Sequence, residues 1–452
     1  MLLDDYSGAY EPDFDLSRLS RRALAALGRE WLLHGHLQDR VGMPLVHAGR
    51  SREEMQTVAI EEWMAASPVY SRRMQRALRF GNGDVPTILK NIQLDIGAPH
   101  HFMDFRCRVE DAEHGEFWLA HCGALMDVEP MGEEYVHGMC HDIEDPTFDA
   151  TAVATNPRAQ VRPLHRPPRT PADREPHCHW TIEIVADAEP VLAHANVAIV
   201  EAAKVAGIGV RMPDGDAEPG GWADYSGEFD PDFELEDLSH SALVVTLQEI
   251  AIQSHLLFRA FLLAVSQHYG DDEAAAINPQ VFTGLAGLTA QRLRAALAVD
   301  GDDASAIAKV LQVHPVFYPR TYVDFSVEVI DDERTRFAIG SCPALEEGDG
   351  LTWFSQLGGG ADAAAVINAG HEGEAHAYAT GNTADRALDA IVQAVNPRAA
   401  CHAVATKGSE RFAYEAVIDP DATPAREAPE IALGKISTGA TVTFTPRRPV
   451  RV

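Results

Sequence analysis

Basic residues are scarce in this sequence. Its 452 residues include 37 Lys and Arg against 68 Asp and Glu, which gives a formal net charge of −31, and only five of the basic residues are Lys. A phosphate backbone would be repelled from most of such a surface. We therefore expect no nucleic-acid partner.

The sequence is also poor in cysteine and in long apolar runs. Six cysteines in so long a chain, without the spacing of a small disulfide scaffold, favour free or metal-bound thiols in a reducing compartment. The start of the sequence has no charged segment followed by an apolar one, and no apolar run approaches about 18 residues. The expectation is a soluble, cytoplasmic protein that has no membrane partner.

The sequence does contain an internal repeat. YSGAYEPDFDLSRLSRRAL from Tyr6 matches YSGEFDPDFELEDLSHSAL from Tyr225, and the stretch from His101 matches the stretch from Thr321 at an offset of 220. NPRA also occurs twice, beginning with Asn in each case. Repetition over this length indicates a tandem duplication.

The repeat divides the chain into two units. We expect a first unit at 1–211, a linker rich in Gly, Pro and Asp at 212–222, and a second unit at 223–452. A length of 452 residues with 46% hydrophobic content predicts two to three domains with packed cores. The two units are expected to pack on each other as a pseudo-dimer.

Each unit is predicted to have a helical half followed by a strand-rich half. The expected segments of the first unit are helices after Ser20, after Ser51 (with Glu54 in a capping box), from Ser67-Pro68 and at 85–94, strands at 102–109, 116–120 and 177–185, and a helix at 190–205. The fold class is therefore α+β, with helices packed on a small antiparallel sheet, made twice.

Comparing the units suggests which residues serve packing and which serve chemistry. Cys122, Glu30 and His36 have counterparts in the second unit, so we assign them mainly to packing. By contrast, 13 of the 20 histidines precede residue 220, and HCHW at 177–180 aligns with SERF at 409–412. This asymmetry predicts an active first unit and a degenerate, supporting second unit.

The histidines of the first unit suggest a metal site. HGMCH at 137–141 places two imidazoles four residues apart, which on a helix share one face, and HCHW places two on one face of a strand. Two more are expected at the open end of paired strands. We predict a divalent metal ion, Zn²⁺ first and Fe or Mn as alternatives, with ligands drawn from His101, His121, His137, His141, His177 and His179.

Such a metal would lower the pKa of a bound water to near 7 for attack on a C–N or C=O centre of a small molecule. Glu144 and Asp142, which follow the HGMCH run, are the candidate general bases. One alternative is a non-haem iron oxidoreductase, in which two His and one carboxylate leave open positions for O₂. The other is a metal or small-molecule sensor without catalysis. The protein could also form a homo-oligomer, and the sequence leaves this question open.

Arginines gather in a proline-rich stretch just before HCHW. This stretch, 158–177, contains Arg158, Arg166 and Arg169 in a protein that is otherwise strongly acidic. Its prolines fix φ and remove hydrogen-bond donors, so it should be a stiff loop. Arginine binds carboxylate through two parallel hydrogen bonds. We therefore expect these three arginines to recognise a carboxylate-bearing substrate.

The first unit also resembles a known family. A cysteine after the hairpin (Cys140), an Asn156-Pro157 dipeptide and the strand Cys178-His179-Trp180 are similar to L-2-amino-thiazoline-4-carboxylic acid hydrolase-like proteins, relatives of the vinyl-reductase type of α+β domain. The resemblance covers about 150 residues. It implies hydrolysis of a C–N bond in a small amino-acid-like heterocycle, with Cys140 and Cys178 as the carried-over positions.

Overall fold

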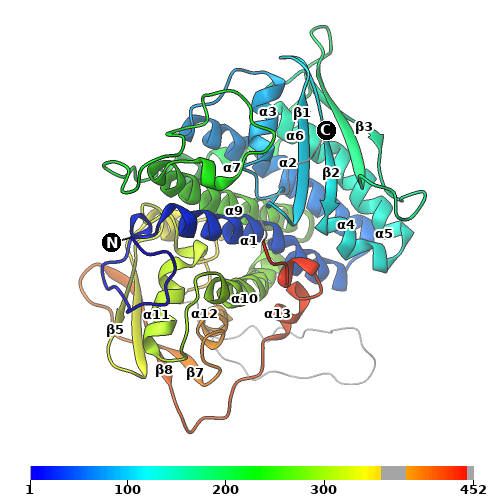
Figure 1. The fold of residues 1–452 in the computed structure, drawn as a ribbon. Coiled ribbons are helices and arrows are strands. Elements are labelled where there is room, and N and C mark those ends of the chain that lie inside the picture. The colour runs from blue at the N-terminus through cyan, green and yellow to red at the C-terminus, as the bar shows by residue number, and fades with distance from the viewer. Residues whose placement is uncertain (1, 358–382, 445–452) are drawn as a thin grey trace.

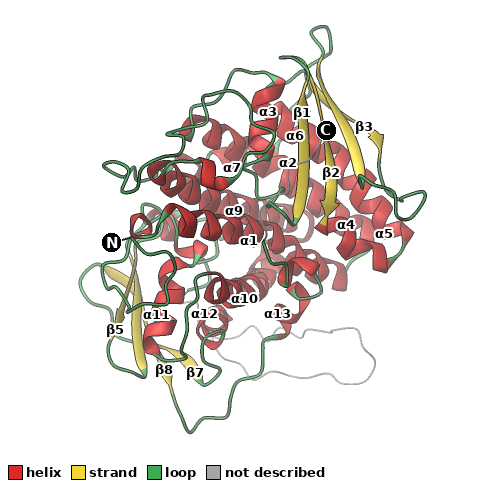
Figure 2. Cartoon of the chain, viewed as in Figure 1, coloured by secondary structure: helices red, strands yellow, loops and turns green. Residues whose placement is uncertain are grey.

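The chain folds into a helical centre with a four-stranded antiparallel sheet on either side (Figures 1 and 2). The structure is a computed structural model and describes residues 2–357 and 383–444. The sheet orders are β1-β2-β4-β3 and β5-β6-β8-β7, so both units share one topology. The predicted α+β class is confirmed.

Among the described residues, both units contain three helices, two strands, a helix and two further strands in that order, and each adds short helices of its own. The first unit contains α1 (Arg21–Ala48), α2 (Arg52–Ala77), α3 (Val85–Ile92), β1 (Met103–Val109), β2 (His114–Cys122), α4 (Gly123–Val128), α5 (Glu133–His137), a π-helical segment (Gly138–Ile143), α6 (Glu144–Val153), β3 (Ala159–His165), β4 (Cys178–Ile184), α7 (Asn196–Glu201) and α8 (Lys204–Gly207). The second contains α9 (His240–Tyr269), α10 (Asp271–Ala296), α11 (Ala304–Val313), β5 (Phe325–Val329), β6 (Arg334–Gly340), α12 (Thr383–Gln393), β7 (Ala399–Ala403), β8 (Glu410–Ile418) and α13 (Pro429–Gly434).

Capping residues set the helix starts that the sequence predicts. Ser20 caps α1, and Ser51 forms a reciprocal capping box with Glu54 at the start of α2. The third helix expected from Ser67-Pro68 is wrong, because Pro68 lies inside an unbroken α2. Packing of α2 along α9 outweighs the cost of an interior proline, about 3 kcal/mol.

The helix predicted at 190–205 is only partly present. Within 190–205 the first helix begins at Asn196, and the helical part of this stretch is divided into α7 and α8. Leu192, which a helix would have had to bury, is 86% exposed. With no apolar face to cover, the preceding residues gain nothing from helix formation.

The helix α9 runs through the middle of the protein. By length and composition it could cross a membrane, but 94% of its apolar window is buried inside the protein. It packs against α1, α2 and α10, so the protein core accounts for its apolar sequence.

Strand register corrects the alignment of HCHW. Phe117 on β2 lies opposite Trp180 on β4, and the corresponding Phe337 on β6 lies opposite Tyr414 on β8. The counterpart of HCHW is therefore RFAY at 411–414, two residues later than the SERF alignment. The histidines at 177 and 179 are absent from the second unit in this register too.

The units are related by reciprocal contacts across α1 and α9. Arg73 of α2 forms a bidentate ion pair with Glu249 of α9 (2.9 Å), and Arg292 of α10 forms the same pair with Glu30 of α1 (2.7 and 3.0 Å). All four side chains are nearly buried. Assigning Glu30 and its counterpart to packing agrees with this interface.

Each unit begins with an N-terminal arm, which contains Tyr6 in the first unit and Tyr225 in the second. The two arms are exchanged, so that each binds the other unit. The Tyr6 hydroxyl donates to Gln312 of the second unit (2.6 Å), and the Tyr225 hydroxyl donates to Gln93 of the first (2.8 Å). The C-terminal segments cross over as well, since the amide of Thr438 binds Asp127 of the first unit (2.7 Å). Each unit therefore completes the other.

Candidate functional site

A cavity of about 340 Å³ lies within the first unit. Helices α1 and α2, strand β1 and the segment from α4 to α6 form most of its wall, and Leu433, Ile436 and Ser437 of the second unit complete it. Gly138 lets the π-helical segment approach α2, because a Cβ there would collide with Gln56, which also lines the cavity. The cavity is thus a product of both units.

The wall is mostly apolar and unusually rich in methionine. Trp63, Phe105 and Phe148 line it. So do five of the ten methionines of the chain, Met43, Met55, Met103, Met131 and Met139. Two apolar lining residues, Met131 (52% exposed) and Ile436 (71% exposed), also reach solvent. Flexible, polarisable methionines suit a site that adapts to apolar ligands.

Two carboxyl groups are in contact at the α1–α2 side of the cavity. Trp63 Nε1 donates to Asp39 Oδ2 (2.9 Å), and the carboxyl of the fully buried Glu62 hydrogen-bonds to Asp39. Burial and the charge of Asp39 raise the pKa of Glu62 well above its usual value. A hydrogen bond between two carboxyl groups needs a proton on one of them, so the pair shares a proton and carries one negative charge.

A third carboxyl group, Asp95, is held by a hydrogen-bond chain. Tyr70 donates to Asp95 Oδ1 (2.9 Å), as does the amide of Gly97 (2.7 Å), and the Tyr70 hydroxyl also contacts Ser67 (2.9 Å). Burial raises the pKa of Asp95 to about 6. Asp95 is therefore mostly ionised at neutral pH.

Glu144, predicted as a general base, lines the cavity. Burial raises its pKa to about 8, so at pH 7 its carboxyl is mostly protonated and can donate a hydrogen bond. Buried thiols surround it: the pKa of Cys140 is raised by burial and by the charge of Glu144, and the pKa of Cys122 is raised to about 12. Such thiols stay protonated, which disfavours Cys140 and Cys178 as nucleophiles.

His36 presents a hydrogen-bond donor at the cavity wall. Arg40 can only donate, so its contact with His36 Nε2 (3.2 Å) leaves the proton of the neutral imidazole on Nδ1. Burial holds the pKa of His36 well below its usual value, in agreement with a neutral ring. Its Nδ1 is buried and has no partner among the described residues.

The predicted metal ligands do not converge. His121 and His177 are neighbours (5.8 Å between ring centres), but the Cys122 amide donates to His177 Nδ1 (3.1 Å). His179 instead pairs with Glu116 (3.1 Å). Within residues 2–357 and 383–444, no three His, Cys, Asp or Glu side chains are grouped to hold a metal ion.

The histidines of HGMCH also differ from the expectation. His137, at the end of α5, and His141, in the π-helical segment, stack face to face (4.1 Å between ring centres) rather than aiming their nitrogens at one point. His141 Nε2 donates to the Pro167 carbonyl (2.7 Å) and is thereby occupied. Asp142, the other candidate base, lies on the surface 3.7 Å from His137 and does not line the cavity.

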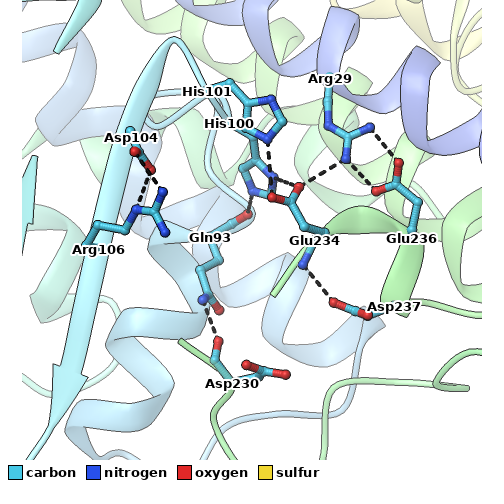
Figure 3. Close-up of polar contacts among 10 residues, drawn as sticks. All are labelled: Arg29, Gln93, His100, His101, Asp104, Arg106, Asp230, Glu234, Glu236 and Asp237. Carbon is cyan, nitrogen blue, oxygen red and sulfur yellow. Dashed lines mark hydrogen bonds and ion pairs between the residues drawn. The ribbon is translucent and has the colours of Figure 1, made fainter. Parts of the chain in front are cut away.

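His101 lies at the unit interface. Figure 3 shows it with His100 beside Glu234 of the second unit, which also pairs with Arg29. Burial alone would raise the pKa of Glu234, but hydrogen bonds from the two histidines and Arg29 lower it. The backbone of His101 has φ +67°, a left-handed conformation that aims it at this contact.

The arginines of the proline-rich loop already have partners. Arg169 forms a bidentate pair with Glu129 (2.8 and 2.9 Å), Arg166 pairs with Asp145, and Arg158 donates to the Ala188 carbonyl (3.2 Å). None of the three lines the cavity. These contacts anchor the loop, and its role in substrate recognition stays a prediction.

The second unit has apolar side chains where the first has its carboxyl pair. Phe258, Val281 and Phe282 stand in place of Asp39, Glu62 and Trp63. Trp353 stacks on Phe258 (3.3 Å between ring centres) and packs against Phe282 (5.2 Å). A comparison of the two halves of the sequence would have singled out Asp39 and Glu62, because the second half has apolar residues at the corresponding positions.

Three comparisons with known proteins extend the picture no further. No family model, no curated protein and no solved structure matches this chain, so the resemblance seen in the sequence stays a prediction.

Proposed function

We propose that the first unit is an enzyme that binds a small, mainly apolar molecule in its cavity and acts on it by general acid–base catalysis. The observation that carries this proposal is the pairing of an apolar cavity of about 340 Å³ with carboxyl groups whose protonation is tuned by burial. An apolar pocket with a few perturbed titratable groups is the usual form of a catalytic site.

Glu144 and the Asp39–Glu62 pair suit complementary roles. A group with a pKa of about 8 can give up and regain a proton near neutral pH, which makes Glu144 the candidate acid. The ionised half of the Asp39–Glu62 pair is the candidate base. Hydrolysis of a C–N bond, as the sequence resemblance implies, needs a proton for the leaving nitrogen, and Glu144 could supply it.

A non-catalytic small-molecule sensor is the second candidate. The methionine-rich wall favours it, because such walls accommodate many apolar ligands without the fixed geometry that catalysis needs. Both candidates require occupation of the cavity, and they differ in whether Glu144 is needed for turnover.

Binding is tested with the neutral fluorescent probe N-phenyl-1-naphthylamine. We expect one probe per chain, energy transfer from tryptophan that Trp63→Phe reduces, and loss of binding in Ala124→Phe, which fills the cavity. Phe is the second unit's residue at this place, so Trp63→Phe should fold. Binding that Ala124→Phe leaves intact, in a variant whose thermal unfolding is unchanged, contradicts the proposal.

Catalysis is tested by following small amides and amidines with apolar bodies. For any that the protein consumes, Glu144→Gln should lower kcat by about a hundredfold or more, the usual contribution of a general acid. A kcat unchanged in Glu144→Gln, with probe binding retained, would leave the sensor as the better description.

A further inference from the structure

We infer that the ligand of this cavity is an apolar molecule that carries a protonated amine. This inference rests on the proposed function and names the class of molecule that the same site takes. It follows from the charges around the cavity, from the hydrogen-bonding atoms that lack partners, and from the aromatic wall.

The positive charges at the cavity wall are already neutralised. Arg40 pairs with Asp127 (3.0 Å), and Arg52 pairs with Glu134 (2.7 Å). Beyond the wall, Arg166 faces Glu144 but forms its own pair with Asp145. No cation of the wall is therefore left to bind an anionic ligand.

The acidic groups at the cavity, by contrast, include some that no described basic residue neutralises. In the described parts of the chain, neither Asp39 nor Asp95 forms an ion pair with a basic residue, so the Asp39–Glu62 pair and Asp95 hold negative charge next to an apolar space. Buried charge without a counter-charge costs several kcal/mol per ion in order of magnitude. An ammonium group in the cavity would remove much of that cost.

Several carboxyl oxygens also lack donors. Within residues 2–357 and 383–444, and apart from the proton that Asp39 and Glu62 share, no N–H or O–H group reaches Asp39 Oδ1, either oxygen of Glu62, or Glu144 Oε2, although all of these atoms are shielded from solvent. An ammonium group has up to three N–H donors and no acceptor, which matches this shortage. A carboxylate ligand could accept from the unpartnered Nδ1–H of His36, but it would place further negative charge beside the Asp39–Glu62 pair and Asp95.

The wall suits the rest of such a molecule. Trp63, Phe105 and Phe148 offer aromatic faces to a cation or to an aromatic body, and the methionine sulfurs contact aromatic rings favourably. A bound ammonium beside Glu144 would also stabilise its carboxylate. Binding at pH 7 should therefore release a proton from Glu144, whose pKa without ligand is about 8.

The test compares three probes of similar size by titration calorimetry on the full chain at pH 7. These are 2-phenylethylamine, 2-phenylethanol and phenylacetate. We expect the amine to bind at least tenfold more tightly than the alcohol, and phenylacetate to bind most weakly. Repeating the titration in buffers of different ionisation enthalpy should show proton release on amine binding.

Variants locate the effect. Glu144→Gln should abolish proton release, and Asp39→Asn should reduce the preference for the amine over the alcohol. Glu113→Gln removes an exposed carboxylate in the β1–β2 turn and should change neither. Asp39→Asn keeps the inference testable if Glu144→Gln fails to fold.

The outcomes separate this inference from the proposed function. An alcohol that binds as tightly as the amine, or phenylacetate as the tightest ligand, overturns the amine inference but leaves the cavity as a binding site. If N-phenyl-1-naphthylamine binds and none of the three probes does, the amine inference is also overturned. Failure of all four molecules to bind overturns the proposed function with it.

Discussion

Glu144 is a cavity residue whose protonation changes close to neutral pH. Burial raises the pKa of its carboxyl to about 8 in the folded protein, from an ordinary 4.5. Between these two values the folded protein holds a proton that the unfolded chain has released. The contribution of this group to the free energy of unfolding is therefore complete below about pH 4.5 and is lost as pH rises to 8.

This sign gives the first prediction. As pH rises from 5 to 8, the free energy of unfolding should fall by up to about 1.4 kcal/mol per pH unit from this group alone. Glu144→Gln should flatten that slope, because Gln does not titrate. Urea unfolding at a series of pH values measures it, with Glu113→Gln as the control. Equal slopes in wild type and Glu144→Gln would show that Glu144 is ionised throughout.

The second prediction decides the metal hypothesis. Since the six predicted histidines do not converge, we expect elemental analysis of purified protein to find well under one Zn, Fe or Mn per chain. His177→Ala and His179→Ala should leave that content unchanged. One metal per chain, lost in either variant, would restore the histidine site as the sequence suggested it.

At the scale of elements, the sequence predicted the duplication and the helix starts because local chemistry determines both. A serine that caps a helix does so through neighbouring amides, as Ser51 does with Glu54. The helix break at Pro68 failed because long-range packing on α9 overrides a local preference.

The site was harder to predict from the sequence because abundance of a residue type does not give its geometry. The number of histidines suggested a metal site, yet His101 and His141 each use a ring nitrogen in a structural hydrogen bond. Glu144 was identified from its place beside them. Asp39 and Glu62 were missed because they lie in ordinary helical stretches, Glu62 next to Glu61, and only the fold brings their carboxyls together.

The third prediction concerns the helices at the interface. Arg292→Met leaves Glu30 buried without a partner and should lower the free energy of unfolding by about 3 kcal/mol or more. The double variant Glu30→Met/Arg292→Met should recover most of that loss, since it removes both buried charges. Urea unfolding measures both.

The control is the exposed pair between Arg334 and Asp331, where Arg334→Met should cost less than about 1 kcal/mol. A double variant at the interface that is no more stable than Arg292→Met alone would mean that the ion pair, not the burial of its partner, provides the stability.

At the scale of the whole molecule, the exchanged segments make each unit incomplete alone. Residues near Tyr6 bind α11 of the second unit, where Lys309 donates to the Gly8 carbonyl and Gln312 to that of Glu11 (2.8 Å). The wall of the cavity likewise needs Leu433 and Ile436 from the second unit. The fold and the cavity of the first unit thus depend on the second unit.

The last prediction follows from what the first unit would do by itself. A chain of residues 1–218 exposes the buried faces of α1 and α2, and its arm loses Lys309 and Gln312. The first unit carries the same two residue types at the corresponding places, Lys90 and Gln93, which here hold the arm of the second unit. Two copies could therefore exchange arms and rebuild the interface with each other.

We expect residues 1–218 to form a homodimer by light scattering, to unfold at a lower urea concentration than the full chain, and to bind N-phenyl-1-naphthylamine weakly because the wall from α13 is missing. Tyr6→Ala should dissociate this dimer, since it removes the hydroxyl that reaches the partner's glutamine, whereas Glu113→Gln, in the exposed β1–β2 turn, should not. A stable monomer with full probe binding would contradict the dependence of the first unit on the second, and would make the second unit an independent domain.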